Sequence, residues 1–370
     1  MKRILTQDSR VLVTGVTGLV GGEVFRHLLA RGHRGRISAL IRPTDESPAR
    51  RIQARLERSG HRAGAPDNVR PVAGDILQPN WALGADDMLD VVGATDMIFH
   101  NAADTSFTDA SDSGTTNVES VRNLIGLVKK CPSPPLIVYM STASNVGDVA
   151  DATVTEADGC RPDNRHFNAY TRSKAVAEQL LRDSGLPVLT LRPTIVLSEG
   201  LDDAKFARQI LWCVPITRVF RALPVNPAAR LDIVDVDFVA EATLRLAAKP
   251  ERRFDCYHLS AGAADAQTIS ELSAAVGSFY GRRTPLATVP PALWTRPLLR
   301  EALKEPVGRR IYRSLMYYFP FLNMNVVYDR TRLEQELGAA CPAVKRVSDY
   351  MPRLLKLIGT KAAFKEAMVP

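Results

Sequence analysis

Apolar residues recur along the first 200 positions in short runs that alternate with longer segments of helical periodicity. The first run, residues 11–13, leads into a glycine-rich turn, and Val20, Val24, Leu28 and Leu29 then follow at helical spacing. Short apolar runs bounded by turn residues are typical of buried strands, and longer periodic segments are typical of helices packed on one face. The pattern therefore predicts a strand, a turn and a helix at the start of the chain.

The same alternation continues through most of the chain. Further strands are predicted at residues 36–41, 68–75, 94–103, 134–144 and 185–196, with helical segments such as 117–130 between them. Strands that alternate with helices form parallel sheets with helices on both faces. The predicted fold class is therefore α/β, a doubly wound parallel sheet.

The alternation loosens after residue 198 into a proline-containing stretch. Residues 231–249 then show a short apolar run followed by helical periodicity, which we interpret as a return to the sheet domain. We therefore predict a dinucleotide-binding domain over residues 1–198 with 228–250. A smaller, interleaved C-terminal subdomain, comprising residues 199–227 and 251–370, is predicted to bind the substrate or cover it.

The segment from residue 290 to 325 mixes aromatic and basic side chains. Its members are Trp294, Tyr312, Tyr317, Tyr318, Phe319 and Phe321, interspersed with Arg296, Arg300, Arg309, Arg310 and Arg313. Two interpretations stay open, a packed subdomain with solvated arginines and a lid over an apolar substrate. A surface-binding helix is also compatible with this composition, so peripheral membrane contact stays open.

The net charge of the chain favours acidic partners but does not identify which one binds. The chain of 370 residues carries a formal charge of +8, which favours acidic partners such as a phosphorylated cofactor, coenzyme A or an acidic carrier protein. It has no RNP-like aromatic motif, zinc-finger spacing or helix-turn-helix pattern, so we expect no nucleic-acid partner.

Cysteine usage and hydropathy indicate a cytoplasmic protein. The cysteines are five in number, widely scattered and without CxxC pairing, which fits reduced thiols better than disulfides or zinc ligands. Glu156 and Asp158 lack the spacing of a carboxylate pair or a metal site, so we expect no metal. The N-terminus does not resemble a signal peptide, and no apolar stretch approaches the ~18 residues of a membrane span.

Three glycines follow the first predicted strand at three-residue spacing, Gly15, Gly18 and Gly21. At a strand-to-helix turn such glycines allow a tight turn, close approach of a pyrophosphate to backbone N–H groups, and close helix packing. This arrangement predicts a Rossmann-type dinucleotide site. The residues expected to bind the cofactor in this turn are Gly15, Thr17, Gly18, Leu19, Val20 and Gly21.

Arg42 ends the second predicted strand, where sites that prefer NAD carry an acidic residue for the ribose hydroxyl. An arginine there suits the 2′-phosphate of NADP(H). Arg34 and Arg36 are alternative phosphate ligands, and a solvated surface role for Arg42 is also open.

Tyr170 and Lys174 are four residues apart in a predicted helix, so they share one face a turn apart. An ammonium beside a phenol favours the phenolate, and we expect it to lower the tyrosine pKa and make Tyr170 a general acid or base. Thr142, at the end of an apolar strand, can place a hydroxyl beside the same carbonyl. These three residues form the predicted catalytic group.

With these motifs in order, the sequence resembles an extended short-chain dehydrogenase/reductase. The resemblance covers about residues 10–250 and is carried by VTGVTGLVGGEVFRHLL, ALIRP, VAGDILQPNWAL, MIFHNAADTSF, TNVESVRNLI, YMSTAS, NAYTRSKAVAE, LRPTIV and LDIVDVDFVAEA. Within that family it is most similar to the branch of fatty acyl-CoA reductases and thioester reductase domains. The cofactor contacts that this resemblance implies are Asp75 and Ile76 at the adenine, Asn101, Ala102 and Ala103 beside the cofactor, Lys174 at the ribose, and Pro193 and Thr194 at the nicotinamide end.

The resemblance implies an NADP(H)-dependent reductase in which Tyr170 protonates a carbonyl oxygen that Thr142 hydrogen-bonds. The expected substrate is an acyl thioester on coenzyme A or a carrier protein, reduced to aldehyde and onward to alcohol, or the derived aldehyde. A free ketone or aldehyde, as in relatives that act on hydroxysteroids or flavonols, is the alternative. A nucleotide-sugar epimerase or dehydratase is disfavoured because Ala143 and Ser144, rather than acidic residues, follow Thr142. A dinucleotide-binding protein without turnover is disfavoured because Tyr170 and Lys174 are both present.

Overall fold

The structure is a computed structural model, and its description covers most of the chain. It describes residues 3–58, 65–107, 113–198, 222–223, 225–281, 287–288 and 318–358. Most of the predicted boundary region 199–227 therefore lies outside the described residues. The same holds for the basic and aromatic segment 290–325 up to residue 317.

Seven strands form one central sheet in which every neighbouring pair is parallel. Its order is β12-β7-β5-β4-β1-β2-β3, from β12 (Cys256–Leu259), β7 (Val188–Pro193), β5 (Leu136–Met140), β4 (Met97–His100), β1 (Val11–Thr14), β2 (Ile37–Ile41) and β3 (Val69–Ala73). Six of these strands lie where the apolar runs predicted them. The predicted parallel α/β fold is confirmed.

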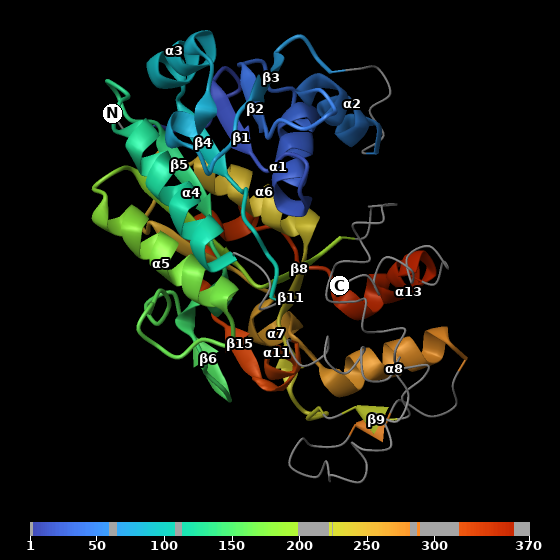
Figure 1. Cartoon of the computed structure of the whole chain (residues 1–370). Helices are drawn as coiled ribbons and strands as arrows, with labels where there is room; N and C mark the ends of the chain where they lie inside the picture. Colours follow the sequence, from blue (N-terminus) through green and yellow to red (C-terminus); the bar gives the residue numbers. More distant parts are fainter. Residues whose placement is uncertain are drawn as a thin grey trace.

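Helices cover both faces of the sheet (Figure 1). Side chains of the strands alternate between these two faces. Along β1, Val11 and Val13 pack with the core that contains α1 (Leu19–Ala30), α2 (Pro48–Arg58) and α6 (Val236–Ala247). Leu12 points to the opposite core, formed with α3 (Ala85–Ala94), α4 (Ser113–Val128) and α5 (Ala169–Asp183). This is the alternation that a strand with a side-chain period of two imposes on a doubly covered sheet.

The edge strand β12 falls within the range 251–370 that the sequence assigned to the smaller subdomain. It nevertheless pairs with β7, with Cys256 opposite Thr190 and Leu259 opposite Pro193. The strand has only four residues, one of them His258, so its apolar run is too short to stand out in the sequence although α6 precedes it.

A second core lies beside the sheet domain and joins α8 (Ile269–Phe279) to α13 (Val347–Ile358) (Figure 1). The remaining elements of the described residues are short: η1 (Pro79–Ala82), η2 (Ala143–Val146), β6 (Ala152–Val154), β8 (Ile195–Leu197), β9 (Ala222–Leu223), β10 (Arg230–Leu231), β11 (Ile233–Asp235), α7 (Gly262–Asp265), β13 (Gln267–Thr268), β14 (Ala287–Thr288), α11 (Phe319–Asn323), β15 (Val326–Tyr328), α12 (Thr331–Leu337) and η6 (Gly338–Ala340). Among them, β15 pairs with β6 and β8 with β11, so distant parts of the sequence meet below the sheet.

The helices of the described residues are all too short or too polar to cross a membrane.

Candidate active site

A cavity of about 870 Å³ lies along the carboxyl ends of the central strands, where open α/β sheets bind their ligands. All the site residues predicted from the sequence line it: Gly15, Thr17, Gly18, Leu19, Val20, Gly21, Arg42, Asp75, Ile76, Asn101, Ala102, Ala103, Thr142, Tyr170, Lys174, Pro193 and Thr194. The fold therefore brings into one cavity residues that are up to 179 positions apart in the sequence, from Gly15 to Thr194.

The glycine turn is packed too closely for side chains. Gly15 has a φ of +73°, and a Cβ there would lie 2.8 Å from the backbone nitrogen of Ala102. A Cβ on Gly21 would lie 2.4 Å from the carbonyl oxygen of Gly15. Helix α1 begins directly after Gly18 without a side-chain cap or an acidic residue in its first turn, so its first N–H groups can receive an anionic ligand.

The strand ends beside this turn are held by short polar contacts. The Thr14 hydroxyl oxygen accepts the backbone N–H groups of Asn101 at 3.2 Å and Ala102 at 3.1 Å, which joins the ends of β1 and β4. Burial, together with the nearby Lys174, lowers the pKa of the neighbouring His100 to about 3, so that imidazole is neutral and structural. The Asp75 carboxylate accepts the N–H of Leu77 at 3.0 Å, which fixes the turn after β3.

Three arginines gather at the end of the cavity near β2, of which the sequence indicated one. Arg42 is exposed after β2, and Arg51 of α2 donates to its carbonyl oxygen at 2.7 Å. Arg55, one turn further along α2, is buried with its guanidinium 3.6 Å from Glu23. The spacing of Arg51 and Arg55, four residues apart, was the available signal for them.

The two alternative phosphate ligands do not line this cavity. Arg34 forms two hydrogen bonds of 2.9 Å with Asp8, and Arg36 pairs with Asp90 at 2.5 Å. Of the three phosphate ligands considered from the sequence, Arg34, Arg36 and Arg42, it is Arg42 that lines the cavity.

The predicted catalytic group meets where α5 passes the end of β5. The Tyr170 and Thr142 hydroxyls are hydrogen-bonded to each other, and Lys174 donates to the Met140 carbonyl oxygen at 2.8 Å. The α5 helix begins at Ala169, because the Asn168 side chain accepts the N–H of Thr171 at 2.9 Å and caps it. Tyr170 and Lys174 thus lie on the first and second turns and face the strand.

The expected lowering of the tyrosine pKa is not what the structure shows. Burial raises the pKa of Tyr170 to about 12, and the Thr142 hydrogen bond opposes this only in part. Burial also lowers the pKa of Lys174 to about 7, with Glu178 opposing. Desolvation is the largest cause of both pKa shifts, since each group is held away from water. Tyr170 is therefore a neutral phenol at physiological pH, which carries the proton that a donor needs.

Aromatic rings form a wall beside Tyr170. The ring centroid of Phe107 lies 5.4 Å from those of Tyr170 and Tyr318 and 5.2 Å from that of Phe321. All four rings line the cavity. The sequence placed Tyr318 and Phe321 in an aromatic segment without locating them, and it did not single out Phe107, because this contact joins regions more than 200 residues apart.

Two further polar residues have structural partners near the cavity. Asn117 of α4 accepts the Asp104 N–H and donates to the Asp104 carbonyl and the Ser173 hydroxyl, at 2.9–3.0 Å. The Nδ1 atom of His166 is hydrogen-bonded to the Thr171 hydroxyl at 3.2 Å, and its Nε2 atom lies 2.9 Å from the Arg161 carbonyl oxygen. Both residues hold loops around the start of α5.

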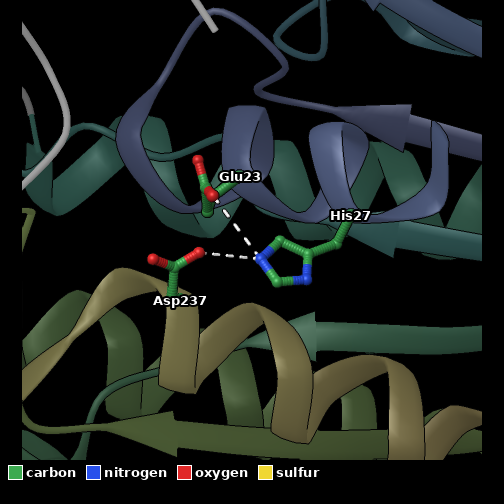
Figure 2. Close-up of side chains that lie close together, drawn as sticks. All are labelled: Glu23, His27 and Asp237. Carbon is green, nitrogen blue, oxygen red and sulfur yellow. Dashed lines mark hydrogen bonds and ion pairs between the residues drawn. The ribbon is translucent and has the colours of Figure 1, made fainter. Parts of the chain in front are cut away.

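Among the described residues, one cluster has the composition of a metal site, and it lies away from the cavity between α1 and α6. Figure 2 shows Glu23 and His27 of α1 facing Asp237 of α6. The Arg26 guanidinium lies 2.5 Å from Glu23 and 2.7 Å from Asp237, where it supplies the positive charge that a cation would bring. Burial lowers the pKa of His27, but hydrogen bonds to Asp237 and Glu23 outweigh it and raise that pKa to about 9, so His27 is protonated. The cluster is an ion-pair contact between helices.

Comparison with known proteins adds a family and a fold. The profile of a family described as "Male sterility protein" matches residues 13–243. The chain is 26% identical over 94% of its length to the nonribosomal peptide synthetase asaC of Aspergillus flavus, of which it spans 37%. It is 25% identical over 63% of its length to the putative fatty acyl-CoA reductase CG8303 of Drosophila melanogaster, of which it spans 51%. The chain thus spans between about a third and a half of these relatives.

Among solved structures, the terminal R domain from the myxalamid PKS-NRPS pathway superposes with a TM-score of 0.77 at 24% identity. The match covers 96% of this chain and 92% of that domain. The shared fold extends over both the sheet and the C-terminal part.

Proposed function

The chain belongs to the male sterility protein family, within the extended short-chain dehydrogenases/reductases, and on that premise we propose that it reduces acyl thioesters with NADPH. It is an oxidoreductase that uses a nicotinamide dinucleotide. The observation that carries the proposal is the meeting of Thr142, Tyr170 and Lys174 at one end of a cavity whose other end is lined by the glycine turn and the arginines to which we assign the dinucleotide.

The choice of NADPH rests on the arginines. Arg42, Arg51 and Arg55 line the same end of the cavity, and the described lining residues there include one carboxylate, Asp75. Charge-assisted hydrogen bonds from guanidinium groups are the usual means of holding a phosphate. We therefore assign the 2′-phosphate to Arg42 and Arg51, with the pyrophosphate on the first turn of α1. The bound cofactor supplies a hydride.

The protein's own part in the reaction is proton transfer and orientation. The neutral Tyr170 phenol donates its proton to the carbonyl oxygen as hydride reaches the carbonyl carbon, and the Thr142 hydroxyl hydrogen-bonds the same oxygen. Lys174 holds the ribose at this end. The resulting hemithioacetal then breaks its carbon–sulfur bond as its hydroxyl gives up a proton and the sulfur takes one up, which releases the thiol and leaves an aldehyde. A second hydride and proton convert that aldehyde to an alcohol.

The substrate end of the cavity favours an apolar acyl group over a sugar nucleotide. Phe107, Tyr318 and Phe321 supply flat apolar surface beside Tyr170, and Lys174 is the one cation among the described residues that line this end. A nucleotide diphosphate would need cations for its phosphates, whereas an alkyl or aryl chain gains from contact with rings. We assign the thiol carrier to coenzyme A or an acidic carrier protein, which suits the charge of +8.

The test is a substrate panel. Purified protein is incubated with NADPH or NADH and with matched acyl-CoA thioesters, acyl-carrier protein, aldehydes and ketones, and the products are identified by mass spectrometry. We expect aldehyde or alcohol from thioesters, with NADPH preferred. Turnover confined to free ketones, or to sugar nucleotides, would overturn the proposal.

A further inference from the structure

Helix α5 faces the end of β5 through three successive turns, and the third contact involves a residue outside the catalytic group. Tyr170 bonds Thr142, Lys174 bonds Met140, and Glu178 accepts the Ser141 hydroxyl at 2.8 Å. Residues four apart on a helix lie on one face, so each turn meets a different residue of the strand end. The catalytic pair therefore continues into a three-step ladder.

Glu178 is itself held by a buried arginine. Its carboxylate accepts two hydrogen bonds from Arg192 of β7, at 2.5 and 3.1 Å, and one from Asn145 at 2.6 Å. The side chains of Glu178 and Arg192 are 2% and 0% exposed. Arg192 immediately precedes Pro193 and Thr194, which line the cavity. One ion pair thus joins α5, the end of β5 and the end of β7.

The surrounding loop is shaped to admit this arginine. Arg192 also donates to the Glu156 carbonyl oxygen at 2.8 Å. A Cβ on Gly159 would lie 2.1 Å from an Arg192 nitrogen, so any larger residue there would displace the guanidinium. A buried ion pair contributes little to stability compared with a well-packed apolar pair, which points to a role in specifying geometry.

We propose that Glu178, held by Arg192, is a positioning residue that locks the last residues of β5 against α5 and supplies the negative charge that faces Lys174. The other titratable groups around Lys174 are His100, which is neutral, the Tyr139 ring 5.0 Å from the ammonium, and the Tyr170 phenol. Glu178 is therefore the anion that favours the charged form of Lys174 against burial. The proposal rests on the catalytic roles given above to Tyr170 and Lys174.

Two variants separate this role from simple packing. Glu178→Gln keeps hydrogen-bond acceptors for Ser141 and Asn145 but leaves Arg192 buried without its anion, so it can fail to fold. The double variant Glu178→Gln/Arg192→Met removes both charges and keeps the volume, and thermal melting checks that it folds. Arg182→Met, at the exposed partner of Glu178, is the matched control.

The direct readout is the pKa of Lys174, measured by NMR titration of ¹³C-labelled lysine side chains and assigned by the loss of its signal in Lys174→Arg. We expect a lower pKa in the folded double variant than in the wild type, a still lower one in Glu178→Gln if it folds, and no change in Arg182→Met. In the two Glu178 variants kcat should fall at least tenfold while the dissociation constant of NADPH changes less than threefold, and in Arg182→Met neither quantity should change.

A folded double variant with the wild-type Lys174 pKa and wild-type kcat would overturn the proposal. The titration needs no substrate, so it remains decisive if no thioester is reduced. In that case the proposed function fails, and the role of Glu178 is judged from the Lys174 pKa and from turnover of whichever carbonyl the protein reduces.

Discussion

The two ends of the cavity are lined by different kinds of groups, backbone and arginine side chains at one end and buried helix side chains at the other. The end that we assign to the dinucleotide consists of backbone at Gly15 and Gly21 and of arginine side chains. The catalytic end consists of side chains on α5 whose positions are set by buried hydrogen bonds to β5. Backbone and arginine contacts tolerate small movements, whereas a proton donor must stay within hydrogen-bond reach of the reacting oxygen.

The helices that carry the two ends are anchored differently as well. Helix α1 is tied to α6 by the partly exposed cluster of Arg26, His27 and Asp237, and α5 is tied to β7 by the buried Glu178–Arg192 pair. We therefore expect substitutions near α1 to weaken cofactor binding gradually. Substitutions near α5 should lower turnover steeply. The following predictions test that contrast, beginning with the largest effect.

Tyr170→Phe should lower kcat by about 10³-fold, roughly 4 kcal/mol, because it deletes only the proton donor. The ring remains against Phe107, so the dissociation constant of NADPH should stay within twofold of the wild type. Steady-state kinetics and fluorescence titration of NADPH measure the two quantities. Near-normal turnover in this variant would show that another group donates the proton.

His27→Ala should reduce the free energy of unfolding by roughly 2 kcal/mol at pH 6, an effect that depends on pH. The pKa of His27 is raised from 6.5 to about 9 in the folded protein, so its stabilisation is full below pH 6.5 and is lost as pH rises through 9. Denaturant unfolding of the variant and the wild type at pH 6 and pH 10 measures this. A difference that did not shrink at pH 10 would argue against a charged contact between α1 and α6.

Arg42→Ala should weaken NADPH binding about tenfold, roughly 1.5 kcal/mol, and leave NADH binding nearly unchanged. The guanidinium contacts only the added phosphate in our assignment. Arg34→Ala, which breaks a pair with Asp8 outside the cavity, is the control and should change neither constant. Equal losses for both cofactors would place Arg42 elsewhere on the dinucleotide.

Phe107→Ala should raise KM for medium-chain and aryl acyl substrates about fivefold, roughly 1 kcal/mol, and affect an acetyl substrate less. The ring bridges Tyr170, Tyr318 and Phe321, so its removal opens the wall beside the carbonyl. Kinetics over an acyl series give the comparison. A uniform loss across chain lengths would indicate that Phe107 supports Tyr170 rather than the substrate.

The parts of the fold that could be predicted from sequence are those encoded by neighbours along the chain. Apolar runs located six strands, and the glycine spacing and the Tyr170–Lys174 spacing pointed to residues that line one cavity. Strand β12 was missed because its four residues include a histidine and form too short an apolar run to stand out.

The parts that could not be predicted depend on burial and on distant contacts. The pKa of Tyr170 was expected to fall beside Lys174 and instead rises to about 12, because sequence does not reveal how completely a phenol is desolvated. The wall of Phe107 and Phe321 joins residues 214 positions apart, and the partners Glu178 and Arg192 belong to different elements. Such pairs become visible only when the sheet is assembled.

The central claim, thioester reduction, is tested most directly by counting thiol against cofactor. Acyl-CoA is incubated with enzyme and NADPH, and free thiol and NADPH oxidation are followed in the same sample, with Tyr170→Phe as the matched variant. The account predicts one thiol released per NADPH if the product is the aldehyde, one per two NADPH if it is the alcohol, and both signals about 10³-fold slower in Tyr170→Phe. NADPH oxidation on aldehydes or ketones with no thiol released from any thioester would contradict it.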